Sequence, residues 1–401
     1  MTSRFTLFAV MGSLSLSLTV QADWRQFRGT ENSGLSAMDS TGDWSGETEI
    51  AWDSGLPGRG LACPIVVGDR VYVTASSGPR QETLHVLCFS TTDGKQLWER
   101  SFQATGRTVT HPKTSVAAPS PASDGERIFA FYSSNDLICL DLDGNLQWMR
   151  GLTYDFPNAS NSLGMSSSPV VVGETVIVMV ECDDQSFSAG LNVVTGETKW
   201  QIDRPRRANW TSPVIWPSDN QAQVLLQSSA GVTAVDAQTG QELWTYSEGA
   251  STIPSLVVSQ NIAYVPSNGI TALRPGESSS TEPEIVWQVG NLSPGTASPI
   301  VWGDKLYVIS GAGVLTSASL EDGKRLWQAR LKGPFSASPI IAGGKIVAVN
   351  EEGFVQVADP DKDGETVSSV ELNETILGTP AVSDGAIYVR GDNHLWKILM
   401  K

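Results

Sequence analysis

The side chains best suited to binding a ligand form a basic run, Arg204-Pro205-Arg206-Arg207, that Asn209 and Trp210 follow. A guanidinium presents a planar fork of donors, which holds a carboxylate or phosphate through two hydrogen bonds. With a second set from an earlier connection, the candidates for ligand or partner binding are Arg107, His111, Lys113, Arg204, Arg206, Arg207, Asn209 and Trp210. They predict a site for an anionic ligand or for an acidic segment of a partner protein. A solvated loop with scattered charge is the alternative.

Three carboxylates alternate along Asp359-Pro-Asp361-Lys-Asp363-Gly364, as they do at the start of a calcium-binding loop. The twelfth position of such a loop requires a bidentate Glu, and here it is Val370. Asp followed by Gly also favours the tight turn of a β-hairpin. Asp359, Asp361 and Asp363 are therefore a calcium candidate without its last ligand, and we expect no other metal site.

No residue can be named as catalytic from the sequence. The three histidines, His85, His111 and His394, are far apart, and no pair has the spacing of a zinc site. Neither a Gly-x-Ser-x-Gly elbow nor a phosphate-binding loop occurs. Hydrolase and nucleotide-dependent functions therefore have no motif to support them.

The chain of 401 residues is acidic, with 43 Asp and Glu against 27 Lys and Arg and a formal net charge of −16. Nucleic acids and anionic membranes attract basic surfaces, so general binding to either is excluded. A hydrophobic fraction of 40% is enough to fill a large core, which excludes intrinsic disorder. We expect a folded monomer.

Residues 1–22 are typical of an export signal peptide. Arg4 is the only charged residue, an apolar run extends from Phe5 to Val20, and Val20-Gln21-Ala22 has the small residues of a cleavage site. Cleavage near Ala22 would leave a periplasmic or secreted protein with no transmembrane segment. No Cys stands at the cleavage point, so the chain lacks the signature of a lipoprotein.

Four cysteines, Cys63, Cys88, Cys139 and Cys182, are too sparse for a disulfide scaffold. We expect small buried thiols, and the spacing leaves open whether one pair forms a disulfide.

A repeat organises the rest of the chain. A small or apolar residue, a Pro and an apolar run recur with Pro at positions 64, 121, 169, 213, 254, 299, 339 and 380, at intervals of 40 to 57 residues. Each unit continues with a Gly turn, a second apolar strand, an alternating third strand and a hairpin turn. This period and pattern predict four-stranded blades of a β-propeller.

Tryptophans mark the last strand of most units. In five units the indole follows the turn glycine by four residues, as Trp98 follows Gly94, whereas the seventh unit has Ser368 in its place. A periodic indole buries a large apolar area, so we interpret these residues as packing devices. The predicted structural docking tryptophans are Trp52, Trp98, Trp148, Trp200, Trp244, Trp287 and Trp327.

The eighth unit ends before its last strand, because the chain stops at Lys401. The segment Glu49-Ile-Ala-Trp52 has the missing pattern, and closing a ring removes exposed sheet edges. We predict one all-β domain over residues 23–401, an eight-bladed propeller whose last blade residues 49–52 complete. Seven blades is the alternative. The connections between units then surround a central mouth, and they carry ten basic and seven acidic residues.

The segment Ala234-Val-Asp-Ala-Gln-Thr-Gly-Gln-Glu-Leu-Trp244 resembles the tryptophan docking motif of the pyrroloquinoline-quinone (PQQ)-like propellers, and Thr92-Asp-Gly-Lys-Gln-Leu-Trp98 matches it too. The opening Asp23-Trp-Arg-Gln-Phe-Arg-Gly29 is similar to the N-terminal segment of exported bacterial members. This resemblance covers the predicted domain and implies the propeller fold. It leaves activity open, because the motif serves blade packing.

Two branches of the family imply different functions. Quinoprotein dehydrogenases bind PQQ with calcium on the propeller axis and oxidise alcohols or sugars, whereas the BamB-like branch binds protein partners. The adjacent cysteines of many dehydrogenases are absent here, and no Asp, Glu and Asn set matches their calcium ligands.

We therefore expect a binding or scaffolding protein of the bacterial cell envelope without a cofactor. Its ligand or partner would bind the face formed by the inter-blade loops. The alternative is a PQQ- and calcium-dependent oxidoreductase. Loop aromatics, Tyr154, Phe156 and Trp210, leave a carbohydrate-binding or lyase-type propeller as a third possibility.

Overall fold

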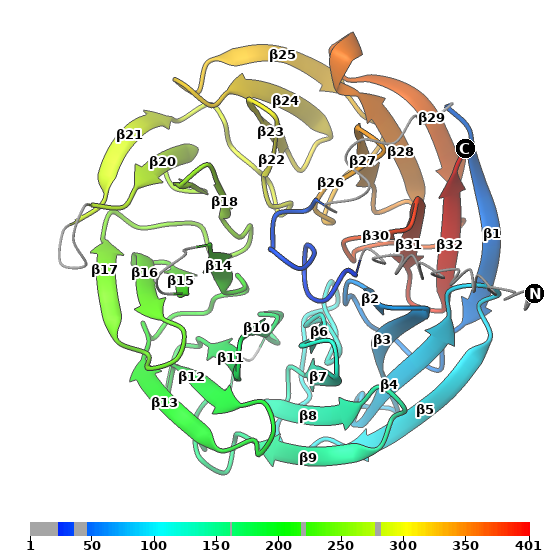
Figure 1. Ribbon diagram of the computed structural model, residues 1–401, viewed down its shortest axis with the longest axis vertical. Helices are drawn as coiled ribbons and strands as arrows, with labels where there is room; N and C mark the ends of the chain where they lie inside the picture. The colour runs from blue at the N-terminus through cyan, green and yellow to red at the C-terminus, as the bar shows by residue number, and fades with distance from the viewer. Residues whose placement is uncertain (1–22, 36–45, 161–162, 218–221, 277–281) are drawn as a thin grey trace, which may run out of the picture.

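A computed structural model describes residues 23–35, 46–160, 163–217, 222–276 and 282–401. The predicted signal peptide lies outside these residues. The strands form eight four-stranded antiparallel sheets arranged around one axis, as predicted (Figure 1). No helix in the described ranges has the length and apolar character needed to span a bilayer.

The blades follow the chain order. Blades 1 to 4 are β2 (Ile65–Val67), β3 (Arg70–Ser77), β4 (Thr83–Ser90) and β5 (Gln96–Gln103); β6 (Ala122–Ser123), β7 (Arg127–Phe131), β8 (Asp136–Asp141) and β9 (Leu146–Gly151); β10 (Val170–Val172), β11 (Thr175–Val180), β12 (Phe187–Asn192) and β13 (Thr198–Asp203); and β14 (Val214–Trp216), β15 (Gln223–Ser228), β16 (Gly231–Asp236) and β17 (Glu242–Tyr246). Blades 5 to 8 are β18 (Val257–Ser259), β19 (Ile262–Val265), β20 (Ile270–Arg274) and β21 (Glu284–Val289); β22 (Ile300–Trp302), β23 (Lys305–Ile309), β24 (Val314–Ser319) and β25 (Arg325–Arg330); β26 (Ile340–Ala342), β27 (Lys345–Val349), β28 (Phe354–Asp359) and β29 (Glu365–Glu371); and β30 (Ala381–Ser383), β31 (Ala386–Arg390) and β32 (His394–Met400) with β1 (Thr48–Gly55).

The N-terminal strand closes the ring. β1 pairs antiparallel with β32 from Thr48 opposite Met400 to Gly55 opposite His394. The closing strand is longer than the predicted residues 49–52, and it places the first and last strands of the chain in one blade (Figure 1). Because β1 completes blade 8, the propeller has eight blades, and the seven-bladed alternative is wrong.

The docking indoles link neighbouring blades through the hairpin turns. The Trp98 indole donates to Leu142 O at 3.0 Å, and the Trp148 indole donates to Val193 O at 3.1 Å. A Cβ built on the turn glycine of the next blade would lie within 2.5–2.8 Å of the docking ring at Gly94, Gly144, Gly196, Gly240, Gly323 and Gly364. These glycines, all with positive φ, leave the space in which the indoles dock.

Blades 4 and 7 depart from this arrangement. Trp244 donates to Gln223 at 3.3 Å and packs edge-on against Trp216 with ring centroids 6.2 Å apart. The following blade has a longer Ser-rich connection in place of a four-residue turn. The Trp244 N–H therefore bonds within its own blade, while the ring joins a core cluster that includes residues of blade 5. At the seventh blade, Ser368 bonds Thr48 of β1 at 3.0 Å. Blade 8 has no hairpin between its last two strands, because they come from opposite ends of the chain.

One turn glycine gives a direct test of this packing. Gly144→Ala should lower the free energy of unfolding by about 2–4 kcal/mol. Alanine is disfavoured at the positive φ of this position, and its methyl group would be packed too tightly against Trp98. Gly303→Ala is the matched control, since Gly303 also has a positive φ (64°) but a Cβ there would meet nothing within 4 Å. Urea unfolding of both variants measures the difference. Equal losses would mean that the Trp98 contact contributes nothing.

The four cysteines are free and buried, as expected. Burial raises the pKa of the Cys63, Cys88 and Cys139 thiols to about 12, so they stay protonated at neutral pH.

Candidate functional site

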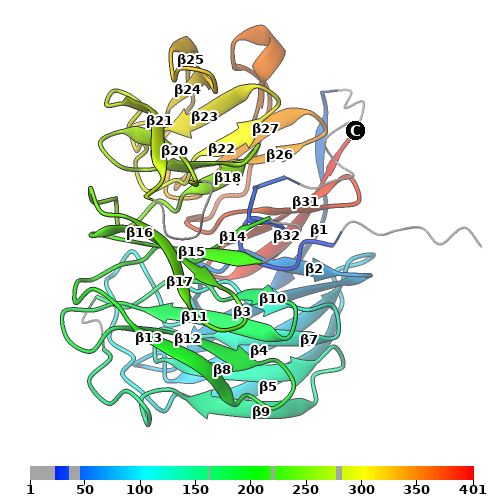
Figure 2. The ribbon, with the colours of Figure 1, turned by 60° about the vertical axis from the view of Figure 1, so that its left-hand side comes forward.

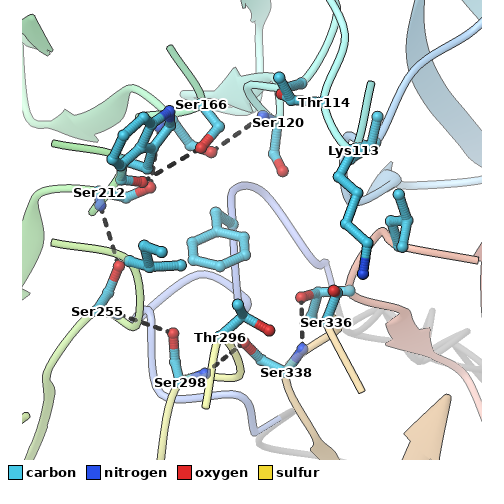
Figure 3. Close-up of a pocket in the computed structure, with 18 of the residues that line it drawn as sticks. Lys113, Thr114, Ser120, Ser166, Ser212, Ser255, Thr296, Ser298, Ser336 and Ser338 are labelled. Atoms are coloured by element: carbon cyan, nitrogen blue, oxygen red, sulfur yellow. Dashed lines mark hydrogen bonds between the residues drawn. The ribbon is translucent and has the colours of Figure 1, made fainter. Parts of the chain in front are cut away.

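A belt of hydroxyl groups surrounds the propeller axis at the start of the innermost strands. The backbone N–H at this position of one blade donates to the side-chain oxygen at the same position of the next blade, in seven successive bonds of 2.8–3.0 Å (Figure 3). The accepting residues are Ser120, Ser168, Ser212, Ser255, Ser298, Ser338 and Thr379. Cys63 takes the eighth position, where its thiol donates to Pro64 O at 3.2 Å.

The position of the fifth unit in the predicted repeat was wrong. The sequence pattern placed the fifth unit at Ile253-Pro254, but the equivalent pair in the structure is Ser255-Leu256. The side-chain hydroxyl is the feature that these seven positions share, because it makes the bond between blades. Proline follows most of them without taking part in that bond.

The N-terminal segment, residues 23–35, crosses the other end of the axial channel (Figures 1 and 2). It starts on blade 1, where Trp24 and Val66 exchange two backbone hydrogen bonds of 2.9 Å. Gln26 and Asn32 then accept backbone N–H groups of blades 3 and 4, from Val171 at 3.1 Å and Ile215 at 3.3 Å. We call residues 23–35 the axial plug.

The plug finishes on blades 5 to 7. The Arg28 guanidinium donates to Leu256 O at 3.2 Å and to Pro299 O. Burial lowers the pKa of Arg28 to about 9, since its partners are neutral carbonyls. Leu35 forms a bridge with Ile341 of β26. Through these contacts the plug thus reaches six of the eight blades and covers one end of the channel.

An axial pocket of about 390 Å³ opens above the plug. Phe27 of the plug provides its floor, the hydroxyl belt lines its lower wall, and an apolar collar interrupted by Ser166, Thr296 and Ser336 lies at its mouth. The collar residues are Leu61, Leu163, Trp210, Ile253 and Leu377. Figure 3 shows Ser212, Ser255, Ser298 and Ser338 around this space, with Lys113 at one side. The pocket is therefore closed below and accessible from the loop face.

Charges at the mouth are largely paired. Lys113 lies 2.9 Å from Glu351, which also accepts the Ser336 hydroxyl at 2.7 Å. Burial raises the pKa of Glu351, but the bonds from Ser336 and Lys113 outweigh it and the net shift is downward. On the same face Arg59 pairs with Asp392 at 3.2 Å. The pocket itself thus presents little net charge.

The predicted binding residues divide into three groups. His111, Lys113 and Trp210 line the axial pocket. Arg107, Arg206 and Arg207 are exposed outside the lining. Arg204 and Asn209 point into the protein, where Arg204 bonds Glu181 at 2.8 Å and Asn209 donates to Gln227 O at 2.8 Å. Only Arg206 and Arg207 of the basic run are therefore accessible to a ligand or partner.

Sequence reasoning did not identify the belt or Phe27 as parts of a site. The small residue before most repeat prolines is visible in the sequence, but the pattern indicates only that a strand begins there. Phe27 lies outside the repeat, so no periodic signal marks it.

The alternating carboxylates belong to a turn. Asp359 ends β28 and caps η2, a 3-10 helix over Pro360–Lys362, by accepting the Asp361 N–H at 3.1 Å. Its carboxylate also pairs with Lys345 at 3.0 Å. Asp363 follows in the left-handed region. Among the described residues, no three His, Cys, Asp or Glu side chains are grouped to hold a metal ion.

Blade 1 contains a linked Ser–His–Glu set. The Ser77 hydroxyl lies 2.7 Å from His85 Nε2, and Glu99 lies 2.8 Å from His85 Nδ1. The backbone of Gly58 packs over this serine, since a Cβ on Gly58 would lie 3.0 Å from that of Ser77. We interpret the set as a polar link between β3, β4 and β5.

The chain matches the family described as outer membrane protein assembly factor BamB over residues 12–180, 160–265 and 278–367. It belongs to this family of PQQ-like propellers. A search of the curated proteins finds no match.

Solved structures share the fold at low sequence identity. BamB from Moraxella catarrhalis superposes with a TM-score of 0.64 at 18% identity, over 88% of this chain and 98% of the other. Quinohemoprotein alcohol dehydrogenase from Comamonas testosteroni gives 0.72 at 14% identity, over 94% and 80%. A europium-containing methanol dehydrogenase gives 0.70 at 12%, over 94% and 98%. The fold is thus shared with an outer membrane protein assembly factor and with dehydrogenases, so function must be argued from the site.

Proposed function

We propose that this protein is a binding protein of the bacterial cell envelope, and that it engages its ligand or partner at the loop face around the axial pocket. The pocket itself carries this proposal. It offers hydrogen-bond donors and apolar walls for recognition, in a space closed on one side. The described lining has no carboxylate, no thiol and no linked nucleophile and base.

Its surroundings support a protein partner. The exposed Arg107, Arg206 and Arg207 lie on connections of the same face, beyond the pocket lining. Guanidinium groups at a rim steer an acidic segment toward the mouth. The family description and the N-terminal signal pattern support a periplasmic or secreted location.

The rival function, a PQQ- and calcium-dependent oxidoreductase, finds less support in the same residues. Calcium takes six to eight oxygen ligands, among which carboxylates are prominent. The described lining offers serine and threonine hydroxyls, and its one cation, Lys113, is paired with Glu351. This donor set does not fit a calcium-held quinone carrying several negative charges, and we derive no step through one.

Site-specific crosslinking tests the binding face. A photoreactive amino acid at Ile253, in the collar, should capture a partner from envelope extracts. The same group at Glu321, in a hairpin turn at the opposite ends of the strands, should not. Adding Arg206→Ala and Arg207→Ala should weaken the capture at Ile253. Equal capture at both positions would contradict a binding site on the loop face.

Quinone titration tests the rival function. Adding PQQ and calcium to the purified protein should leave its Trp fluorescence unquenched, and no dye should be reduced with alcohols or sugars. Trp210 lines the pocket and reports on its occupancy. Saturable quenching with turnover would overturn the proposal and establish a quinoprotein dehydrogenase.

A further inference from the structure

The hydroxyls of the belt retain unused donors. Each of the seven accepts a backbone N–H, and across the described residues none of them donates to a protein acceptor. A hydroxyl can donate one bond while it accepts another. These side chains are at most 6% exposed and line the pocket, so their O–H groups are available to a molecule on the axis.

The pocket is close to electrically neutral. Lys113 is the only Lys, Arg, Asp or Glu of the described lining, and Glu351 neutralises it at 2.9 Å. The Arg28 guanidinium is committed to the carbonyls of Leu256 and Pro299. A charged ligand would lose its hydration here without gaining an opposite charge, so a neutral ligand fits better.

The floor and collar add an aromatic surface. Phe27 lies at the floor of the pocket, below the belt, and Trp210 is part of the collar at its mouth. A ligand that suits this arrangement has a flat apolar face for the ring and a periphery of oxygen atoms for the hydroxyls. A sugar ring combines these features, because its C–H groups form the faces and its hydroxyls project from the edge.

We propose that the axial pocket binds a neutral saccharide, with a terminal sugar ring over Phe27 and its oxygens bonded to the hydroxyl belt. A volume of about 390 Å³ with one closed end suits the end of a chain, and longer saccharides would leave through the mouth. This inference rests on the proposed function, for which it names the chemical class of ligand.

Calorimetric titration with glucose, maltose, cellobiose and N-acetylglucosamine tests the proposal, with glucuronate as the charged comparator. At least one neutral sugar should bind saturably and more tightly than glucuronate. Phe27→Leu, which keeps an apolar floor without an aromatic face, should weaken binding about tenfold, whereas Phe27→Tyr should retain it.

A second pair of variants separates the hydroxyl from its position. Ser338→Ala should weaken sugar binding about fivefold, the effect of one hydrogen bond, while Ser338→Thr should preserve it. Thr379 holds the equivalent position in blade 8, so the belt accommodates threonine. Glu321→Ala, at an exposed hairpin turn at the opposite ends of the strands, should bind sugar like the unchanged protein. Thermal unfolding of each variant checks that it remains folded.

Three outcomes would overturn the saccharide-binding proposal. They are no binding of any neutral sugar, tighter binding of glucuronate, and undiminished binding in Phe27→Leu. If the Ile253 crosslink still captures a partner, the saccharide inference fails and the proposed binding function stands, with a partner's peptide segment as the occupant. If the Ile253 crosslink captures no partner and no sugar binds, both the saccharide inference and the proposed binding function are wrong.

Discussion

Replacing Arg204 by alanine should lower the free energy of unfolding by about 3–5 kcal/mol at pH 7. The Arg204 side chain donates to Glu181 at 2.8 Å and to Leu226 O at 3.0 Å. Both members of the ion pair are buried, with side chains 3% and 1% exposed. Removing the cation leaves the Glu181 carboxyl group in an apolar interior without its partner, and the cost of keeping it charged or of protonating it there falls entirely on the folded state.

The loss should shrink as the pH falls. Burial raises the pKa of Glu181 to about 7, and Arg204 opposes this rise. Without Arg204 the folded-state pKa rises further above the unfolded value. The folded variant then holds a proton that its unfolded chain has released, so stability falls as pH increases and recovers in acid. Urea unfolding at pH 8 and pH 5.5 should give the smaller deficit at pH 5.5.

Arg206→Ala is the matched control, because Arg206 is exposed two residues along the same loop. It should change stability by less than about 0.5 kcal/mol at either pH. A deficit in Arg204→Ala that is equal at both pH values would show that Glu181 does not titrate in response, and the buried pair would not explain the loss.

This pair shows what a local pattern can predict. The blades follow from signals within a few residues, such as Asp143-Gly144 and the indole of Trp148, so their order and number could be predicted from the sequence. The partner of Arg204 lies in a different connection, and the pairing of β11, β12 and β13 within blade 3 brings Glu181 to it. The sequence therefore indicated the charge of Arg204 but neither its burial nor its ion pair with Glu181.

The hydroxyl belt illustrates a second limit. Its bonds join residues 40 to 57 positions apart, and each bond depends on the angle between two complete blades. The sequence presents these residues as small and preceding a proline. The convergence of Ser212, Ser255 and Ser298 on one axis becomes visible only when the ring is closed.

The axial plug is the part of the fold that the repeat could not predict, and Trp24 should be its main anchor. Trp24→Ala should lower the free energy of unfolding by about 3–5 kcal/mol, the usual effect of deleting a buried aromatic side chain. Trp24 is fully buried and packs in the core that blades 1, 7 and 8 share. The variant loses this contact while its backbone bonds to Val66 remain possible.

Loss of this anchor should also reach the pocket, because Phe27 forms the floor three residues further along the plug. We expect weaker binding of any axial ligand in Trp24→Ala, together with faster proteolysis within residues 23–35. Glu31→Ala, at an exposed position of the same segment, should leave stability within about 0.5 kcal/mol and binding unchanged. A Trp24→Ala deficit below about 1 kcal/mol, well under the usual effect of deleting a buried aromatic side chain, would mean that the plug docks loosely and that the channel can open from this end.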